Sequence, residues 1–262
     1  MLAPSLRRLA GVDDLLELAP DDPYVLAEAD PARVSSTWAG PDGALGWVVP
    51  SRRVAGAGHL VALGSDAAVG ALLTGVLGAL AEADPGGPGI GSVGLPRDAD
   101  RALHPAYALE PRNDWEWFST TDMPAAQPGE AGVHWLGDDE LDAVRELLAT
   151  WSPRHDAVPS GPGVLRWCGV RDGAGRLVAT AAHTEHRSGV PRLASMATAG
   201  DVRGRGLGAA VTAWLTRRLL EEGTGIVTLG MYSDNAVARR IYERLGYVCA
   251  HAFTSGRLVP TP

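Results

Sequence analysis

A glycine-rich turn between a strand and a helix constrains this chain more than any other feature. The stretch Ser195–Ala210 reads SMATAGDVRGRGLGAA, so an apolar strand runs into Arg203-Gly204-Arg205-Gly206-Leu207-Gly208 before a helical pattern begins. Glycines let a ligand approach the backbone, and the first N–H groups of a helix attract an anion. The turn predicts a site for a phosphate-bearing ligand; an ordinary turn with two solvated arginines is the alternative.

Two other phosphate motifs do not fit this turn. Gly204, Gly206 and Ala209 match the loose pattern G-x-G-x-x-A of dinucleotide-binding domains, but no acidic residue ends the next strand at the expected position. The loop G-x-x-x-x-G-K-[ST] is excluded because all 23 basic residues are arginines. The chain is therefore not a nucleoside triphosphatase of the P-loop kind.

Composition and charge narrow the function further. Hydrophobic residues make up 45% of the 262 residues, as in globular proteins, and a net charge of −8 argues against a broad nucleic-acid-binding face. The two cysteines, Cys168 and Cys249, are expected to be buried and cannot alone form a disulfide framework or a four-ligand zinc site. The sequence has no HExxH motif and no paired-carboxylate ligand spacing, so no metal is implied.

Neither candidate apolar segment predicts a targeting signal or a membrane span. Asp13 and Asp14 interrupt the N-terminal apolar stretch, which therefore lacks the core of a signal peptide. The uncharged run over 67–81 is shorter than a membrane span and contains glycines, which favours a closely packed helix. We expect a cytoplasmic protein that binds neither membranes nor nucleic acid.

A polar segment rich in Pro, Gly and Ala divides the chain. It predicts a linker over 123–132 between domains of residues 1–122 and 133–262. The second half then predicts an α+β domain with a mixed sheet in the order β-α-β-β-β-α-β-α-β. Its predicted strands cover 133–136, 164–170, 177–186, 192–198, 225–231 and 247–254, and its helices cover 141–151 (capped by Asp138 or Asp139), 206–221 and 236–245.

A segment of the first half is weakly similar in sequence to a segment of the second half. GIGSVGLPRDADRALHPAYAL from Gly89 and GIVTLGMYSDNAVARRIYERL from Gly225 share several residues at one offset, and a glycine-rich helix precedes each. The order indicates a divergent internal duplication, with chance similarity as the alternative. In the strand over 114–120, Trp115 and Trp117 share a face, and they are expected to pack in the core or between domains, or to form walls of an acceptor cleft.

Together, the motifs of the second half resemble those of the GNAT acyltransferases, which use acetyl-CoA. Arg203-x-x-Gly206-x-Gly208 is similar to the family signature R/Q-x-x-G-x-G/A, and the segments MAT-x-x-D, Asp234-Asn235 and IYERLGY agree in order. The resemblance covers about residues 133–254. It implies two GNAT-like α+β domains in tandem, the first degenerate and the second active.

The resemblance also assigns roles to residues. The strand before the signature would lie along the pantetheine arm, the turn would bind the pyrophosphate, and Asn235 would contact the CoA arm. Tyr242 would be catalytic and protonate the departing thiolate. It lies nearly in line with Asn235, off the helix stripe that we expect in the core, namely Val237, Ile241 and Leu245. The implied cofactor-binding residues are Met196, Ala197, Thr198, Arg203, Gly204, Arg205, Gly206, Leu207, Gly208 and Asn235.

These roles leave alternatives open and leave the general base unassigned. Asn235 also suits a helix N-cap, and Tyr242 a packing position at the edge of the core. Where many relatives carry a glutamate, this chain has Ser195. The candidate bases are the pairs His183 with Glu185 and His155 with Asp156.

The predicted function is transfer of an acetyl group from acetyl-CoA to an amine acceptor, either a small molecule or a peptide. A non-catalytic acyl-CoA-binding sensor or regulatory module is the main alternative, and a nucleotide-binding oxidoreductase is the other. The first half lacks the arginine-glycine turn and has Ala99 at the position equivalent to Asn235. We therefore expect it to bind no CoA and either to wall the acceptor cleft or to hold a homo-oligomer together.

Overall fold

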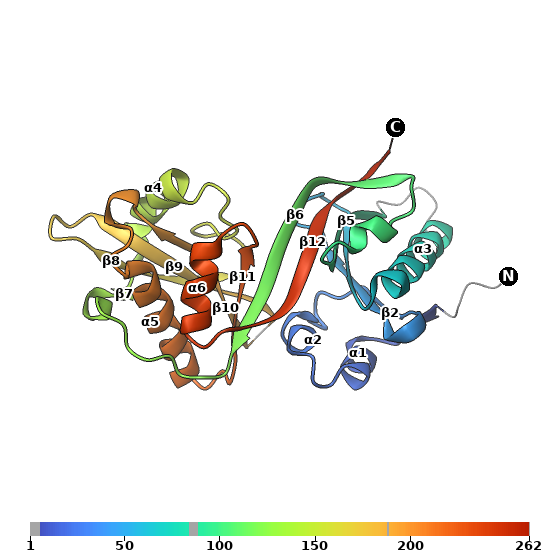
Figure 1. Cartoon of the computed structure of the whole chain (residues 1–262), viewed down its shortest axis with the longest axis horizontal. Helices are drawn as coiled ribbons and strands as arrows, with labels where there is room; N and C mark the ends of the chain where they lie inside the picture. The colour runs from blue at the N-terminus through green and yellow to red at the C-terminus, as the bar shows by residue number, and fades with distance from the viewer. Residues whose placement is uncertain (1–5, 84–88, 188, 262) are drawn as a thin grey trace. The chain divides into compact units, whose positions relative to one another are not determined.

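The structure, a computed structural model, describes residues 6–83, 89–187 and 189–261. Runs of β-strands and single helices follow one another along the chain, and parallel and antiparallel strand pairs both occur, which confirms the predicted α+β class with a mixed sheet. The chain divides into two compact units, drawn together in Figure 1. The first unit comprises Met1–Trp117, Tyr232–Asp234 and Ala250–Pro262, and the second comprises Phe118–Met231 and Asn235–Cys249.

The division differs from a simple cut at the predicted linker. Residues 123–132 belong to the second unit, where the buried carboxylate of Glu130 accepts hydrogen bonds from the backbone N–H of Gln127 and from Arg217. Most of the last strand, β12 (Val248–Pro260), groups with the first unit although it was predicted within the second domain. The interpretation of the halves as tandem GNAT-like domains stays a prediction.

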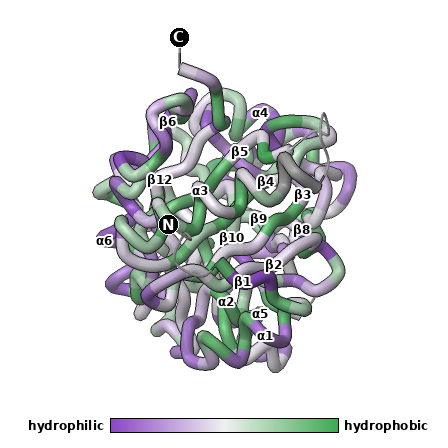
Figure 2. Tube along the Cα trace, turned by 90° about the vertical axis from the view of Figure 1, so that its right-hand side faces the viewer, coloured by the Kyte–Doolittle hydropathy of each residue, from purple (hydrophilic) through white to green (hydrophobic). Residues whose placement is uncertain are grey.

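The first unit contains a sheet in the strand order β1-β2-β3-β4-β5-β12-β6. Asp22 begins one of its helices by accepting hydrogen bonds from the N–H groups of Tyr24 and Val25. Figure 2 shows the hydrophobic stretches of this unit along its strands and its long helix. Its other elements are β1 (Arg7–Arg8), α1 (Val12–Leu18), α2 (Pro23–Glu28), β2 (Ser36–Ala39), β3 (Leu45–Pro50), β4 (Gly58–Leu63), α3 (Asp66–Ala83), β5 (Ile90–Pro96) and β6 (Tyr107–Thr120), with 3-10 helices over Pro41–Gly43 and Ala99–Ala102.

The strand β6 carries the two tryptophans singled out above. Trp117 is buried and its indole N–H donates a hydrogen bond of 2.9 Å to Glu28. The ring of Trp115 stacks on Phe253 of β12 with centroids 4.6 Å apart. Both contacts are packing within the first unit, as the core alternative predicted.

The second unit contains a sheet in the order β11-β10-β9-β8-β7, and its elements follow the predicted order. Figure 1 shows two of its helices, α5 and α6, in front of that sheet. The elements are β7 (His134–Trp135), α4 (Leu141–Trp151), β8 (Val164–Arg171), β9 (Leu177–Arg187), β10 (Val190–Thr198), α5 (Leu207–Glu221), β11 (Val227–Tyr232) and α6 (Ala236–Arg244), with 3-10 helices over Glu130–Gly132, Asp138–Glu140 and Gly200–Val202.

Two local predictions for this unit need correction. Neither Asp138 nor Asp139 caps α4, because both lie inside a 3-10 helix and the carboxylate of Glu140 accepts the hydrogen bond from the N–H of Gly137 instead. Cys168 is buried, and burial raises the pKa of its thiol to about 12. Cys249 is exposed, as are its neighbours Val248 and Ala250 in β12.

Each unit contains a parallel strand pair that follows two antiparallel pairings. In the first unit, β2 pairs with β3 and β3 with β4 in antiparallel fashion, and β4 then pairs with β5 in parallel. In the second unit, β8, β9 and β10 repeat that pattern and β10 pairs with β11 in parallel. The shared order favours the internal duplication.

The two parallel pairs differ in the number of residues over which the strands are paired. The pairing of β4 with β5 continues for four residues, from Gly58 to Val61. The pairing of β10 with β11 covers Arg192 and Leu193, after which five residues of β10 have no register with β11. The second unit therefore has an open strand edge where the first unit has hydrogen-bonded strands.

None of the helices in the described parts of the chain combines the length and the low polarity that a membrane crossing requires.

Candidate functional site

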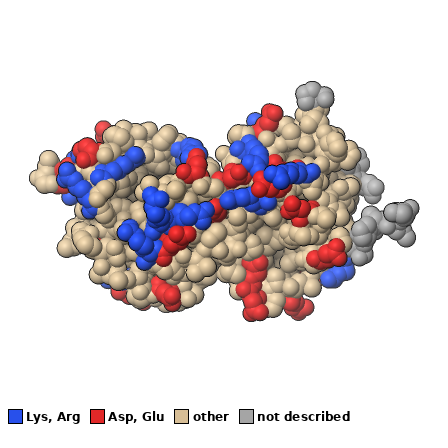
Figure 3. Space-filling view, in the orientation of Figure 1, with Lys and Arg blue, Asp and Glu red and all other residues tan. Residues whose placement is uncertain are grey.

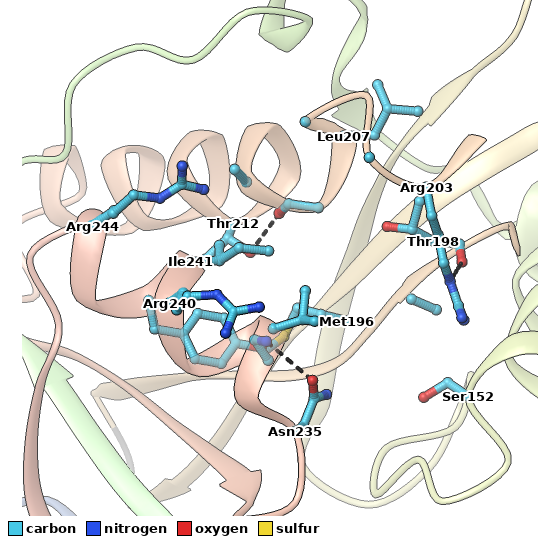
Figure 4. Close-up of a pocket in the computed structure, with 18 of the residues that line it drawn as sticks. Ser152, Met196, Thr198, Arg203, Leu207, Thr212, Asn235, Arg240, Ile241 and Arg244 are labelled. Atoms are coloured by element: carbon cyan, nitrogen blue, oxygen red, sulfur yellow. Dashed lines mark hydrogen bonds between the residues drawn. The ribbon is translucent and has the colours of Figure 1, made fainter.

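A cavity of about 990 Å³ lies in the second unit, within the range of small-molecule sites. Figure 4 shows its walls, which come from the end of α4, the open end of β10, the glycine-rich turn with the start of α5, and one side of α6. Its lining residues are Trp151, Ser152, Met196, Ala197, Thr198, Val202, Arg203, Gly204, Gly206, Leu207, Gly208, Ala209, Thr212, Asn235, Val237, Ala238, Arg240, Ile241, Tyr242, Glu243 and Arg244.

The N-terminus of α5 forms one wall of the cavity. Gly206 is its N-cap residue, with a φ of 81° that glycine adopts without strain, and no side chain caps the helix. The first turn contains no acidic residue, so its N–H groups and the dipole of a 15-residue helix remain available to an anion. By contrast, Asp66 lies in the first turn of α3 in the first unit.

The open end of β10 forms the second wall. A bulge between Ala194 and Ala197 interrupts its pairing with β9, and Ser195 within it has a φ of 51°. The Ser195 hydroxyl accepts a hydrogen bond from the N–H of Ala157 and donates one to its carbonyl oxygen, which holds the loop after α4 against the bulge. Met196 and the two residues after it line the cavity beyond the point where β11 has separated.

Arg203 lies at the edge of the cavity in a defined position. Its guanidinium donates hydrogen bonds of 3.2 Å to the carbonyl oxygens of Thr198 and Trp151 and lies over the Trp151 ring. That ring packs directly against Gly200, where no Cβ would fit. Arg205 is exposed and lies outside the lining, although its role was predicted together with that of Arg203.

Asn235 and Tyr242 both line the cavity from α6. The side-chain oxygen of Asn235 accepts a 3.0 Å hydrogen bond from the N–H of Ala238, so this residue is the N-cap of α6 (Figure 4). Tyr242 is 5% exposed, and its ring lies edge-on to Phe118 and Tyr247. Its hydroxyl makes no hydrogen bond within the described part of the chain, and burial raises its pKa, so it stays protonated at neutral pH.

Neither pair of candidate bases lines the cavity. His183 is buried and accepts a hydrogen bond of 3.2 Å from Arg166; burial, with the charge of Arg166, lowers the pKa of its imidazole. Nδ1 of His155 lies 2.8 Å from the carbonyl oxygen of Ser152, and the Asp156 carboxylate lies 3.7 Å from Arg192. His183 therefore has the surroundings of a neutral core histidine.

The structure adds cavity residues that the sequence patterns missed. Arg240 and Arg244 line it from α6, and Trp151 and Ser152 from the end of α4. The signal for the arginines was their spacing of four residues, which places both on one side of a helix.

The expected core stripe of α6 is partly wrong. Leu245 is 4% exposed, but Val237 is 61% exposed, and both Val237 and Ile241 line the cavity. Hydrophobic periodicity shows that a helix has an apolar side, but it does not show whether that side faces the core or a binding cavity.

Comparison with known families and proteins agrees with this arrangement. A model of the FR47-like protein family matches residues 168–254, which include the turn, the open end of β10 and α6. Over 53 residues the chain is 47% identical to the mycothiol acetyltransferase of Corynebacterium jeikeium (strain K411). That alignment covers 20% of this chain and 15% of the relative, so it compares one segment and not two whole proteins.

Solved structures resemble a larger part of the chain. A GCN5-related N-acetyltransferase from Kribbella flavida superposes with a TM-score of 0.54 and 24% identity, and the match covers 97% of both chains. A GCN5-related N-acetyltransferase from Sphaerobacter thermophilus gives a TM-score of 0.57 and 16% identity, over 95% of this chain and 85% of that one. The chain therefore resembles the FR47-like family in the segment that carries the glycine turn, and it shares its fold with these two N-acetyltransferases.

Proposed function

We propose that this protein is an acetyltransferase that moves the acetyl group of acetyl-CoA to an amine. One observation supports this most: the free N-terminus of α5, the open edge of β10 and Tyr242 line a single cavity. An anion site, an unpaired backbone edge and a protonated acid are what an acyl thioester of a phosphorylated carrier requires.

Acetyl-CoA is proposed to enter with its pyrophosphate at the glycine turn. The N–H groups at the start of α5 would donate to the phosphate oxygens, and Arg203 at the rim would add positive charge. The pantetheine arm would then lie along Met196–Thr198, whose backbone groups on the side of β11 have no strand partner. These residues are the ones that the resemblance to the family implied, apart from Arg205.

The proposed reaction is direct attack on the thioester. The amine nitrogen forms a bond to the carbonyl carbon, the carbon–sulfur bond breaks, and the electron pair leaves with the sulfur. Backbone N–H groups of β10 would stabilise the charge that develops on the carbonyl oxygen. Tyr242 would donate its proton to the departing thiolate, because its raised pKa keeps it protonated, and the attacking nitrogen loses a proton to a base or to water.

A non-catalytic acyl-CoA-binding module remains the second candidate. The observation that favours it is the position of both candidate base pairs outside the cavity lining. The acceptor of this chain stays unnamed, since the segment shared with mycothiol acetyltransferase is too short to transfer a substrate. Location in the cytoplasm likewise stays a prediction.

An acceptor screen separates the two candidates. The full chain would be incubated with acetyl-CoA and a panel of amines, including aminoglycosides, polyamines, amino acids and peptides, while free CoA thiol is measured. Transfer predicts amine-dependent thiol release above the rate without protein. It also predicts that the amine gains about 42 Da, because an acetyl group replaces a hydrogen. Tight acetyl-CoA binding without release by any amine class would favour the binding module.

A further inference from the structure

Two arginines on α6 form a separate basic part of the cavity wall. Arg240 and Arg244 are one helical turn apart, and Figure 4 shows both side chains on the α6 side of the cavity. Arg203 stands on another wall and is already bonded to the backbone of Thr198 and Trp151. The α6 arginines therefore line the cavity from a different element than the glycine turn.

Neither α6 arginine is neutralised within the described residues. No hydrogen bond or ion pair joins Arg240 or Arg244 to another side chain there, whereas their neighbour Arg239 lies 3.9 Å from Glu243. Many other arginines of the chain have acidic partners, such as Arg217 with Glu130 and Arg176 with Asp201, and the face in Figure 3 shows red beside much of the blue. Two like charges at this spacing slightly destabilise a helix, so packing alone does not explain them.

A helix-dipole role accounts for one arginine only. Arg244 lies in the last turn of α6, where a cation is favourable in any helix. Arg240 lies one turn earlier, and it reaches the cavity from the same side as Val237 and Ile241. An apolar wall with two free guanidinium groups beside it suits a ligand that ends in an aromatic base and a phosphate.

CoA has three phosphate groups: the pyrophosphate and a separate 3′-phosphate on the ribose. The N-terminus of α5 can serve the pyrophosphate but not a second, distant dianion. We propose that Arg240 and Arg244 bind the 3′-phosphate and make this chain select CoA over 3′-dephospho-CoA. The inference rests on the proposed function, since it assumes that acetyl-CoA occupies this cavity.

Calorimetric titration with two ligands tests the proposal. Wild type, the double variant Arg240→Gln/Arg244→Gln and a control variant would each be titrated with acetyl-CoA and with 3′-dephospho-acetyl-CoA. The control, Arg145→Gln/Arg218→Gln, also removes two charges from exposed helix positions, but outside the cavity lining. Exposed Arg-to-Gln changes should leave the fold intact, and circular dichroism checks this.

The expected result is a preference that depends on both α6 arginines. Wild type and the control should bind acetyl-CoA about 10- to 100-fold more tightly than the dephospho form, from charge-assisted hydrogen bonds to one phosphate. The double variant should bind both ligands with the wild-type affinity for the dephospho form. Equal losses for both ligands, or no preference in wild type, would overturn the proposal. Failure of wild type to bind either ligand would instead refute the proposed function.

Discussion

Replacing Gly206 with valine tests the anion site by adding one side chain at the N-cap of α5. Gly206 has a φ of 81°, and a Cβ built there meets no atom within 4 Å. The cost to folding therefore comes from the backbone and not from a collision. The left-handed conformation costs an L-residue roughly 1–2 kcal/mol. A protein with an ordinary stability of about 5–15 kcal/mol stays folded, with a Tm lower by about 2–8 °C.

The effect on the ligand should be larger than the effect on the fold. Gly206 lines the cavity and has open space at its Cβ position, so we expect the valine side chain to stand where the pyrophosphate approaches the helix N–H groups. Loss of one charge-assisted hydrogen bond costs about 1.5–3 kcal/mol. That corresponds to an increase of about 10- to 100-fold in the Kd for acetyl-CoA. Calorimetry measures the Kd, and thermal unfolding measures the Tm.

Gly223 provides a matched control at the other end of α5. It has a φ of 86°, its Cβ would also meet no atom within 4 Å, and it lies outside the cavity lining. Gly223→Val should therefore lower the Tm by a similar amount and leave the Kd unchanged. If Gly206→Val binds acetyl-CoA like wild type, the N-terminus of α5 is not the phosphate site. If both variants lose affinity equally, backbone strain explains the loss.

Four further expectations follow from the same structure. Tyr242→Phe should slow the chemical step about 10²–10⁴-fold in single-turnover assays and leave the Kd of acetyl-CoA nearly unchanged; a wild-type rate would remove the role as acid. The full chain should bind one acetyl-CoA, because the first unit lacks the open strand edge, and a calorimetric stoichiometry of two would contradict this. Gly200→Ala should displace the ring of Trp151, which should cost about 1–3 kcal/mol of unfolding free energy and weaken acetyl-CoA binding. An unchanged Tm and Kd would show that the contact between Gly200 and Trp151 does not matter. Burial opposes the charge of Glu130, but hydrogen bonds from Arg217 and a backbone N–H lower the pKa of its carboxyl group. The ionised Glu130 therefore contributes fully to the folding stability above the unfolded pKa near 4.5, and this stability is lost as the pH falls through the folded pKa. Glu130→Gln should cost about 1.5–3 kcal/mol in urea unfolding at pH 7 and much less in acid, and equal losses at both pH values would count against the ion pair.

Local sequence patterns were enough to predict much of the site. The glycines of the turn set the backbone conformation where α5 begins, and Gly206 indeed has the positive φ that the pattern favours. The order of strands and helices in the second half follows from hydrophobic periodicity, which depends on residues close in sequence. Asn235 and Tyr242 line one cavity because seven residues make two turns of a helix.

Other features depend on contacts between residues far apart in sequence. Nothing in the pattern of β12 indicates that it pairs with β5, because a strand carries no local record of its partner. The bulge at Ser195, which interrupts the pairing of β10 with β9, is held by hydrogen bonds to Ala157 in a loop far away in sequence. Whether the apolar side of α6 faces the core or a cavity depends on which elements cover it. The helix spacing placed Arg240 and Arg244 on one side of α6, but the tertiary structure was needed to show that this side lines the cavity and that neither arginine has an acidic partner among the described residues.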